Sequence, residues 1–140
     1  MINNSNQEHT VESLKNKSAN EPVANYLGMK LLDLSEGFSR VSMTLRPEHL
    51  NFNGLVFGGI IMSIADLAFA YATNCANVPN VAAQFSIQFI SGASVGDVLT
   101  AECTVIKRGN RACFSEMVVN NQKGKLIAKA MGVTIPINRS

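Results

Sequence analysis

The segment at residues 60–76, IIMSIADLAFAYATNCA, decides our interpretation of the chain. Its length and its content of Ala, Leu, Met and Ile are typical of a helix, and the absence of a polar face predicts burial on almost all sides. Within it stands Asp66, the only Asp, Glu, Lys or Arg between Glu48 and Asp97. Because burial of an ionised carboxylate is unfavourable, we expect Asp66 either to bind a neighbouring polar group or to take part in chemistry.

Gly58 and Gly59 stand immediately before this predicted helix. They could mark a junction where a Cβ atom would clash, or they could bring bare backbone N–H groups close to a ligand. If they open the same helix, Gly58 and Asp66 are about 12 Å apart along its axis. That separation is too long for one substrate carbonyl, so a common role requires Gly58 of one subunit to face Asp66 of a partner. A two-fold axis would make this arrangement twice.

The composition predicts one compact domain, since 46% of the 140 residues are hydrophobic and 16% are charged. The polar segment at residues 1–20 is expected to be a flexible or loosely docked tail, which leaves residues 21–140 as the domain. Alternating apolar residues and turn signals predict a curved antiparallel sheet around the helix at residues 60–74, an α+β fold. The further elements that we predict are a short helix at 22–27 and strands at 30–33, 38–45, 81–89, 98–107, 111–120 and 125–135.

Charge and cysteine content argue against several classes of function. The net charge is near +2 and no basic run occurs, so neither nucleic acid nor a membrane is an expected partner. Three widely spaced cysteines, Cys75, Cys103 and Cys113, indicate reduced and mostly buried thiols rather than disulfides or a zinc site. The N-terminus lacks the pattern of a signal peptide and no apolar run of about 20 residues follows, which predicts a cytoplasmic protein.

A resemblance to a known family rests on residues 49–59, HLNFNGLVFGG, followed by Ala65 and Asp66. This pattern resembles the H-x-N-x-x-G-x-x-H-G-G…D signature of hotdog-fold acyl-CoA thioesterases of the phenylacetic-acid-degradation (PaaI) type. The similarity extends over residues 25–137. It implies a hotdog fold, in which the sheet wraps the long helix, and a homodimer or a dimer of dimers with sites at the subunit interface.

The resemblance also implies an activity, the hydrolysis of an aryl-acetyl or medium-chain acyl-CoA to free acid and CoA without a metal or other cofactor. Gly58, supported by Gly59, would polarise the thioester carbonyl. Asp66 would act as a general base or as a nucleophile, and Asn51 would orient the water or the thioester. The remaining residues implied are His49, Phe57 and Ala82 for substrate binding, and Lys107, Arg108 and Arg111 for the phosphates of CoA.

The chain departs from the family pattern at Phe57, which replaces the His before the paired glycines. The hydrogen bond of that His is lost, and an aromatic ring there favours an apolar or aromatic acyl group. Ala82 similarly stands where relatives often carry Ser or Thr. Two alternatives to the thioesterase are a non-catalytic acyl-CoA sensor, favoured by Phe57, and a hotdog dehydratase, for which His49 is the only candidate base.

Overall fold

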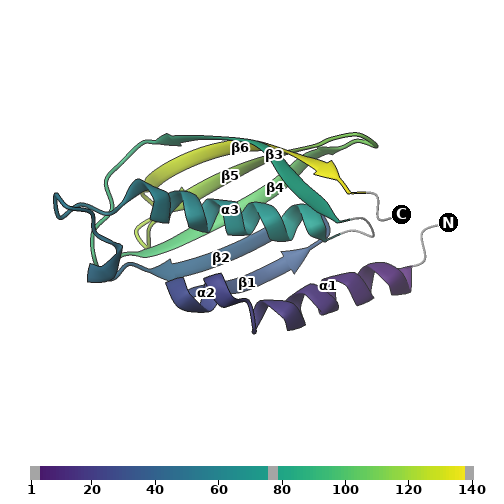
Figure 1. Ribbon diagram of the computed structural model, residues 1–140, viewed down its shortest axis with the longest axis horizontal. Coiled ribbons are helices and arrows are strands. Elements are labelled where there is room, and N and C mark those ends of the chain that lie inside the picture. The colour runs from purple at the N-terminus through teal and green to yellow at the C-terminus, as the bar shows by residue number, and fades with distance from the viewer. Residues whose placement is uncertain (1–3, 76–78, 138–140) are drawn as a thin grey trace.

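The computed structural model describes residues 4–75 and 79–137. Its strands form one antiparallel sheet in the order β1-β2-β4-β5-β6-β3 (Figure 1). The helices are α1 (Asn4–Ser18), α2 (Pro22–Leu27) and α3 (Gly58–Asn74), with a 3-10 helix η1 (Pro47–His49). The strands are β1 (Met29–Ser35), β2 (Phe38–Thr44), β3 (Asn80–Phe89), β4 (Val98–Arg108), β5 (Cys113–Asn120) and β6 (Leu126–Pro136).

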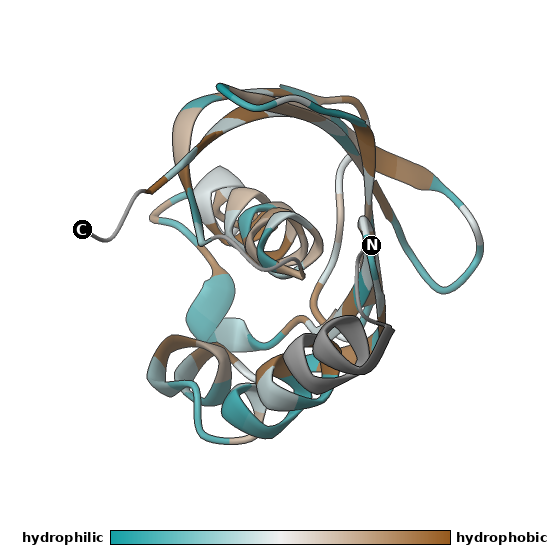
Figure 2. Cartoon of the chain, turned by 90° about the vertical axis from the view of Figure 1, so that its right-hand side faces the viewer, coloured by the Kyte–Doolittle hydropathy of each residue, from teal (hydrophilic) through white to brown (hydrophobic). Residues whose placement is uncertain are grey.

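The sheet curves around α3, while α1 and α2 lie on the other side of that helix (Figure 2). The inner face of β4 is closed against the core, with Leu99, Ala101 and Cys103 fully buried. On α3, Ala65, Ala68 and Ala72 are fully buried, because small side chains let the helix approach the sheet closely. The predicted α+β arrangement of one long helix inside a curved antiparallel sheet is therefore confirmed.

The predicted burial of α3 on almost all sides is wrong for the single chain. Met62, Asp66 and Ala70 are exposed, and they lie on one face because residues three and four apart share a helix face. The chain's own sheet and N-terminal helices leave this face of α3 uncovered. A helix face that is apolar or small around one carboxylate is typical of a surface that another protein covers.

The two edges of the sheet also differ in whether other elements cover them. The edge strand β1 is contacted by α1 and α2. At the other edge, β3 pairs with β6 and with no other strand of residues 4–75 and 79–137, and most of its residues are exposed, including Val81 and Phe89. The outer side of an exposed edge strand is a template for pairing with another strand.

The N-terminal segment contains a helix, α1, where the sequence predicted a flexible or loosely docked tail. Val11 and Leu14 of this helix are partly buried against the core. The Tyr71 hydroxyl of α3 donates a hydrogen bond to the carboxylate of Glu21, and burial with this contact raises the pKa of Tyr71. The division of the chain into a tail and a domain at residue 20 stays a prediction.

Two further properties concern the cysteines and the length of the helices. Cys75, Cys103 and Cys113 are buried, as predicted. Within residues 4–75 and 79–137, no helix has both the length and the apolar character needed to cross a bilayer.

Candidate active site

Helix α3 begins with backbone N–H groups that have no partner among residues 4–75 and 79–137. Phe57 precedes it and provides no side-chain acceptor, so the helix lacks an N-cap hydrogen bond. The N–H of Ile60 donates to the Phe57 carbonyl at 2.9 Å, whereas the amides of Gly58 and Gly59 make no hydrogen bond within the described part of the chain. Free N–H groups at a helix start carry partial positive charge and bind anionic or carbonyl oxygens.

Each glycine of the pair lies against a phenyl ring. A Cβ atom on Gly58 would stand 3.2 Å from Cζ of Phe89, and one on Gly59 would stand 2.6 Å from Cε1 of Phe57. The two rings are 54% and 56% exposed, respectively. The glycines therefore leave room for two aromatic rings beside the free amides. Phe57, in the position of the family His, covers Gly59 with a hydrocarbon surface and offers no hydrogen bond.

A pocket of about 330 Å³ opens at this end of α3. Its walls are mostly apolar and include Leu55, Val56, Ile61 and Phe89, with the loop at residues 90–93 on one side. Gly58 is part of the lining. The pocket thus combines hydrocarbon walls with a free amide, which is the usual composition of a site for a small apolar ligand.

Asp66 lies on the exposed face of α3, two turns after Gly58. Desolvation by the surrounding protein raises the pKa of its carboxyl group above the usual value, and no charged or hydrogen-bonding neighbour offsets this effect. The helix geometry separates Asp66 from Gly58 by about 12 Å along the axis. The two groups therefore cannot act on the same atom within one chain.

The loop before α3 is held by Asn51. Its Oδ1 atom accepts hydrogen bonds from the N–H groups of Asn53 at 2.9 Å and Leu55 at 3.1 Å. The Oδ1 atom therefore caps the loop, which is a structural role. The NH₂ group of the same side chain makes no hydrogen bond within residues 4–75 and 79–137. Asn51 can thus donate to a substrate carbonyl or to water.

His49 is buried within the same loop, with 2% of its surface exposed. Its Nδ1 atom accepts from the Arg46 N–H at 3.0 Å, and its carbonyl accepts from the Phe57 N–H at 2.9 Å. Burial and the Arg46 charge lower the pKa of His49. These contacts hold the loop in place and do not favour a dehydratase base. The predicted contact between His49 and substrate stays a prediction.

The other predicted residues lie away from the pocket. Ala82 is exposed on β3, beside an irregularity in its pairing with β6. Arg108 donates to the carbonyls of Thr73 at 3.1 Å and Ala72 at 3.4 Å, so it caps the carboxyl end of α3. Lys107 and Arg111 are exposed on the same hairpin. Within one chain, these cations lie at the opposite end of α3 from Gly58.

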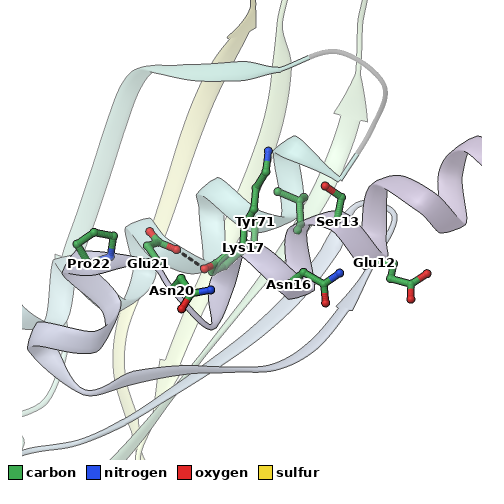
Figure 3. A pocket seen from close by; sticks show the side chains of 9 residues that line it. Glu12, Ser13, Asn16, Lys17, Asn20, Glu21, Pro22 and Tyr71 are labelled. Carbon is green, nitrogen blue, oxygen red and sulfur yellow. Dashed lines mark hydrogen bonds between the residues drawn. The ribbon is translucent and has the colours of Figure 1, made fainter.

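Another hollow lies between α1, α2 and α3, with a volume of about 930 Å³ (Figure 3). Its polar lining includes Asn16, Lys17 and Glu21, and the dashed line in Figure 3 marks the hydrogen bond from Tyr71 to Glu21. None of the predicted site residues lines this hollow. The pocket at the amide end of α3 is therefore the better candidate site.

Comparison with known proteins was decisive for the family. The model of the Thioesterase superfamily matches residues 53–128. The chain belongs to this family. A relative in Archaeoglobus fulgidus is 37% identical to this chain over 119 residues, which are 85% of this chain and 77% of the relative. The acyl-coenzyme A thioesterase PaaI of Escherichia coli is 34% identical over 113 residues, 81% of each chain.

The fold comparison agrees with the family. The solved structure of E. coli PaaI superposes with a TM-score of 0.87 at 30% identity, covering 96% of this chain and 95% of that one. The predicted resemblance to PaaI-type thioesterases, the hotdog fold and the enzyme class, a thioester hydrolase, are thereby confirmed. Sequence reasoning missed Phe89, which carried no signal beyond an aromatic residue at a strand end. It also gave no sign that Arg108 caps a helix, and the predicted contact between Arg108 and the CoA phosphates stays a prediction.

Proposed function

We propose that this thioesterase hydrolyses acyl-CoA in an active site that two copies of the chain share. The observation that carries the proposal is the position of Gly58 and Asp66 on α3. Both groups suit thioester hydrolysis, yet they are about 12 Å apart in one chain and lie on a helix that is partly uncovered. A CoA thioester as substrate is supported by the similarity to E. coli acyl-coenzyme A thioesterase PaaI.

A two-fold symmetric dimer brings the two groups together. If Gly58 of one copy faces Asp66 of the other, the helices run antiparallel and the residue midway between them, Met62, lies near the symmetry axis. Met62 is apolar and 39% exposed, and Gly59 and Ser63 beside it are small enough for close approach. The exposed residues of the edge strand β3 supply a second surface on which two copies could pair.

Met62→Lys tests this dimer, because it places two ammonium groups near the axis. We expect the variant to dissociate in analytical ultracentrifugation and to lose hydrolysis, while its circular dichroism remains that of a folded chain. Val23→Lys is the matched control, since Val23 is an apolar residue that is 51% exposed on a different helix, α2. A monomeric wild type that still hydrolyses acyl-CoA would contradict the shared site.

The reaction follows from the groups present. The Gly58 N–H, with Gly59 and the Asn51 amide in support, hydrogen-bonds the thioester carbonyl and stabilises the oxyanion. The Asp66 carboxylate of the second copy takes a proton from water as the water oxygen bonds to the carbonyl carbon. The carbon–sulfur bond then breaks, and the CoA thiolate recovers that proton. In the nucleophilic alternative the carboxylate attacks first, and water hydrolyses the mixed anhydride.

The apolar pocket walls and Phe57 favour an aryl-acetyl or medium-chain acyl group. Lys107 and Arg111 are the exposed cations that we assign to the CoA phosphates. The proposal includes no metal or other cofactor, so treatment with EDTA is expected to leave the activity unchanged. Three free, buried thiols fit the reducing environment of the cytoplasm, which is where we place the protein.

A panel of aryl-acetyl-CoA and medium-chain acyl-CoA substrates tests the function directly, with a thiol-reactive dye to detect released CoA. We expect hydrolysis of several members and little of acetyl-CoA, because an acetyl group leaves the apolar walls of the pocket uncovered. Tight binding of the panel without any release of CoA would show instead an acyl-CoA sensor.

A further inference from the structure

The end of strand β3 places an aromatic ring beside the free amide of Gly58. Phe89 is the last residue of β3 and pairs directly with Ala128 of β6, so the two side chains point to the same face of the sheet. Ala128 is fully buried, which identifies this as the inner face. Phe89 is nevertheless 54% exposed, because no element of residues 4–75 or 79–137 pairs with the outer edge of β3.

The position of this ring is set by the backbone that carries it. The N–H groups of Ile90 and Ser91, directly after Phe89, both donate to the Ile127 carbonyl, at 2.8 Å and 3.2 Å. The far end of the ring, Cζ, lies 3.2 Å from the point that a Cβ of Gly58 would occupy. The ring is therefore a wall of the pocket on the side nearest the amide.

Most of the remaining walls of the pocket are hydrocarbon. Leu55, Val56, Ile61 and Ile90 surround the same space, which has a volume of about 330 Å³. A ligand whose carbonyl oxygen accepts from the Gly58 N–H must place its hydrocarbon part against these side chains. Since Phe89 stands next to that amide, it is the first side chain such a hydrocarbon group meets.

We propose that Phe89 is a specificity-determining residue whose ring limits the length of the acyl group. The inference rests on the proposed function, because it requires an acyl group bound beside Gly58. A smaller residue at position 89 lengthens the pocket, and longer acyl groups gain apolar contact there. A larger residue shortens the pocket and excludes them. The two directions of change separate a size limit from a general loss of structure.

The test measures binding of two non-hydrolysable thioethers that keep a carbonyl group, 2-oxoheptyl-CoA and 2-oxotridecyl-CoA, to the full chain by isothermal titration calorimetry. We expect Phe89→Ala to shift the ratio of the two Kd values about tenfold toward the longer ligand, and Phe89→Trp to shift it the other way. Phe114→Ala is the matched control, because Phe114 is a strand residue with 43% exposure. Its neighbour Cys113 is buried, so the Phe114 side chain lies on the opposite face of the sheet. This control is expected to leave the ratio unchanged.

Each outcome bears on one proposal or on both. An unchanged ratio in both Phe89 variants, with native circular dichroism, would overturn the size limit and leave the thioesterase function standing. Shifted ratios in a protein that hydrolyses no acyl-CoA would support the size limit and overturn the proposed function. A wild type that binds neither thioether would overturn both.

Discussion

The two ends of helix α3 are built in opposite ways. At its carboxyl end, the last carbonyls are bonded: Arg108 donates to Ala72 and Thr73, and Asn74 donates to Ala70. At its amino end, the Gly58 and Gly59 amides have no partner within the described residues. Every helix leaves such groups at both ends, so the difference lies in what the rest of the chain supplies. One end is fixed by the protein, and the other is left for a ligand.

The packing around the helix follows the same division. Under the carboxyl half, the ring of Phe69 is 1% exposed and lies against Gly132 of β6. At the amino end, the rings of Phe57 and Phe89 lie against glycines but are more than half exposed. Both halves therefore use contacts between glycine and phenylalanine. Only those of the carboxyl half belong to the closed core.

The amino-terminal half of α3, with its free amides and exposed rings, is called the open half below. The largest expected effect tests whether this half carries the chemistry. Asp66→Asn keeps the size of the side chain but removes the base or nucleophile, so we expect kcat to fall by about 10²- to 10⁴-fold. Binding of an acyl-CoA thioether is expected to remain. The control is Asp33→Asn, since Asp33 has a half-exposed side chain with one ion pair, at 3.9 Å to Arg40. A near-normal rate in Asp66→Asn would remove this carboxylate from the mechanism.

Features that depend on residues close together in the chain could be predicted from the sequence, whereas contacts made through the fold could not. The loop motif at residues 49–59 and Asp66 are local patterns that predicted the family, while the apolar content of residues 60–74 and the alternation along the strands predicted the helix and the sheet. The exposed face of α3 could not be predicted, because an apolar helix face looks the same whether its own sheet or a second chain covers it. Phe89 meets Gly58 only through the sheet topology, and no local pattern carries that contact.

Two other differences have similarly physical causes. The segment of α1 is polar, with Val11 and Leu14 packed against the core, so its composition resembled that of a tail. Arg108 stands at a hairpin tip, where a cation is usually solvated or holds an anion. Its role at the end of α3 depends on β4 and α3 reaching the same end of the molecule, which the spacing of charges along one strand does not encode.

The next effect in size concerns stability and contrasts the two kinds of glycine. In Gly132→Ala the new Cβ would lie 2.5 Å from Cζ of Phe69 and 3.1 Å from the Gln84 carbonyl oxygen, and the buried ring has no room to move. We expect the free energy of unfolding to fall by about 3 kcal/mol. In Gly59→Ala the clash is with the exposed ring of Phe57, which can turn away. That variant is expected to change stability by less than about 1 kcal/mol.

Urea denaturation of both variants measures this difference directly. Equal losses of stability would mean that the Phe57 ring is as firmly held as Phe69, which would contradict the division between an open and a closed half. A large loss in Gly59→Ala alone would also show that the amino end of α3 is part of the rigid core.

A smaller effect is expected at the carboxyl end of α3. Arg108→Met keeps most of the side chain's hydrocarbon and removes two hydrogen bonds, to the carbonyls of the buried residues Ala72 and Thr73. We expect a loss of about 1 kcal/mol in the free energy of unfolding with little change in KM. Arg111→Met, on the same hairpin, is the matched control and should not lower stability. A KM that rises in Arg108→Met would instead place Arg108 at the CoA phosphates.

The smallest effect concerns the cost of keeping Asp66 in the open half. Burial raises the pKa of its carboxyl group in the folded chain above 3.8, its value without that burial. Between the two pKa values the folded chain binds more protons than the unfolded chain, so the free energy of unfolding decreases as the pH rises through this window. Asp66→Asn lacks this dependence. At neutral pH it should therefore melt slightly above the wild type, by less than about 4 °C, and the difference should shrink as the pH falls through the window.

The raised pKa of Asp66 changes kcat with pH in the opposite direction to stability. The carboxylate is the active form, so kcat should fall as the pH drops through the raised pKa, where stability increases. Thermal melts and kcat measured over one series of buffers would show the two trends crossing. If Asp66→Asn and the wild type had parallel stability profiles at every pH, the carboxylate would be fully hydrated in the folded protein. The open half of α3 would then provide no desolvated site for it.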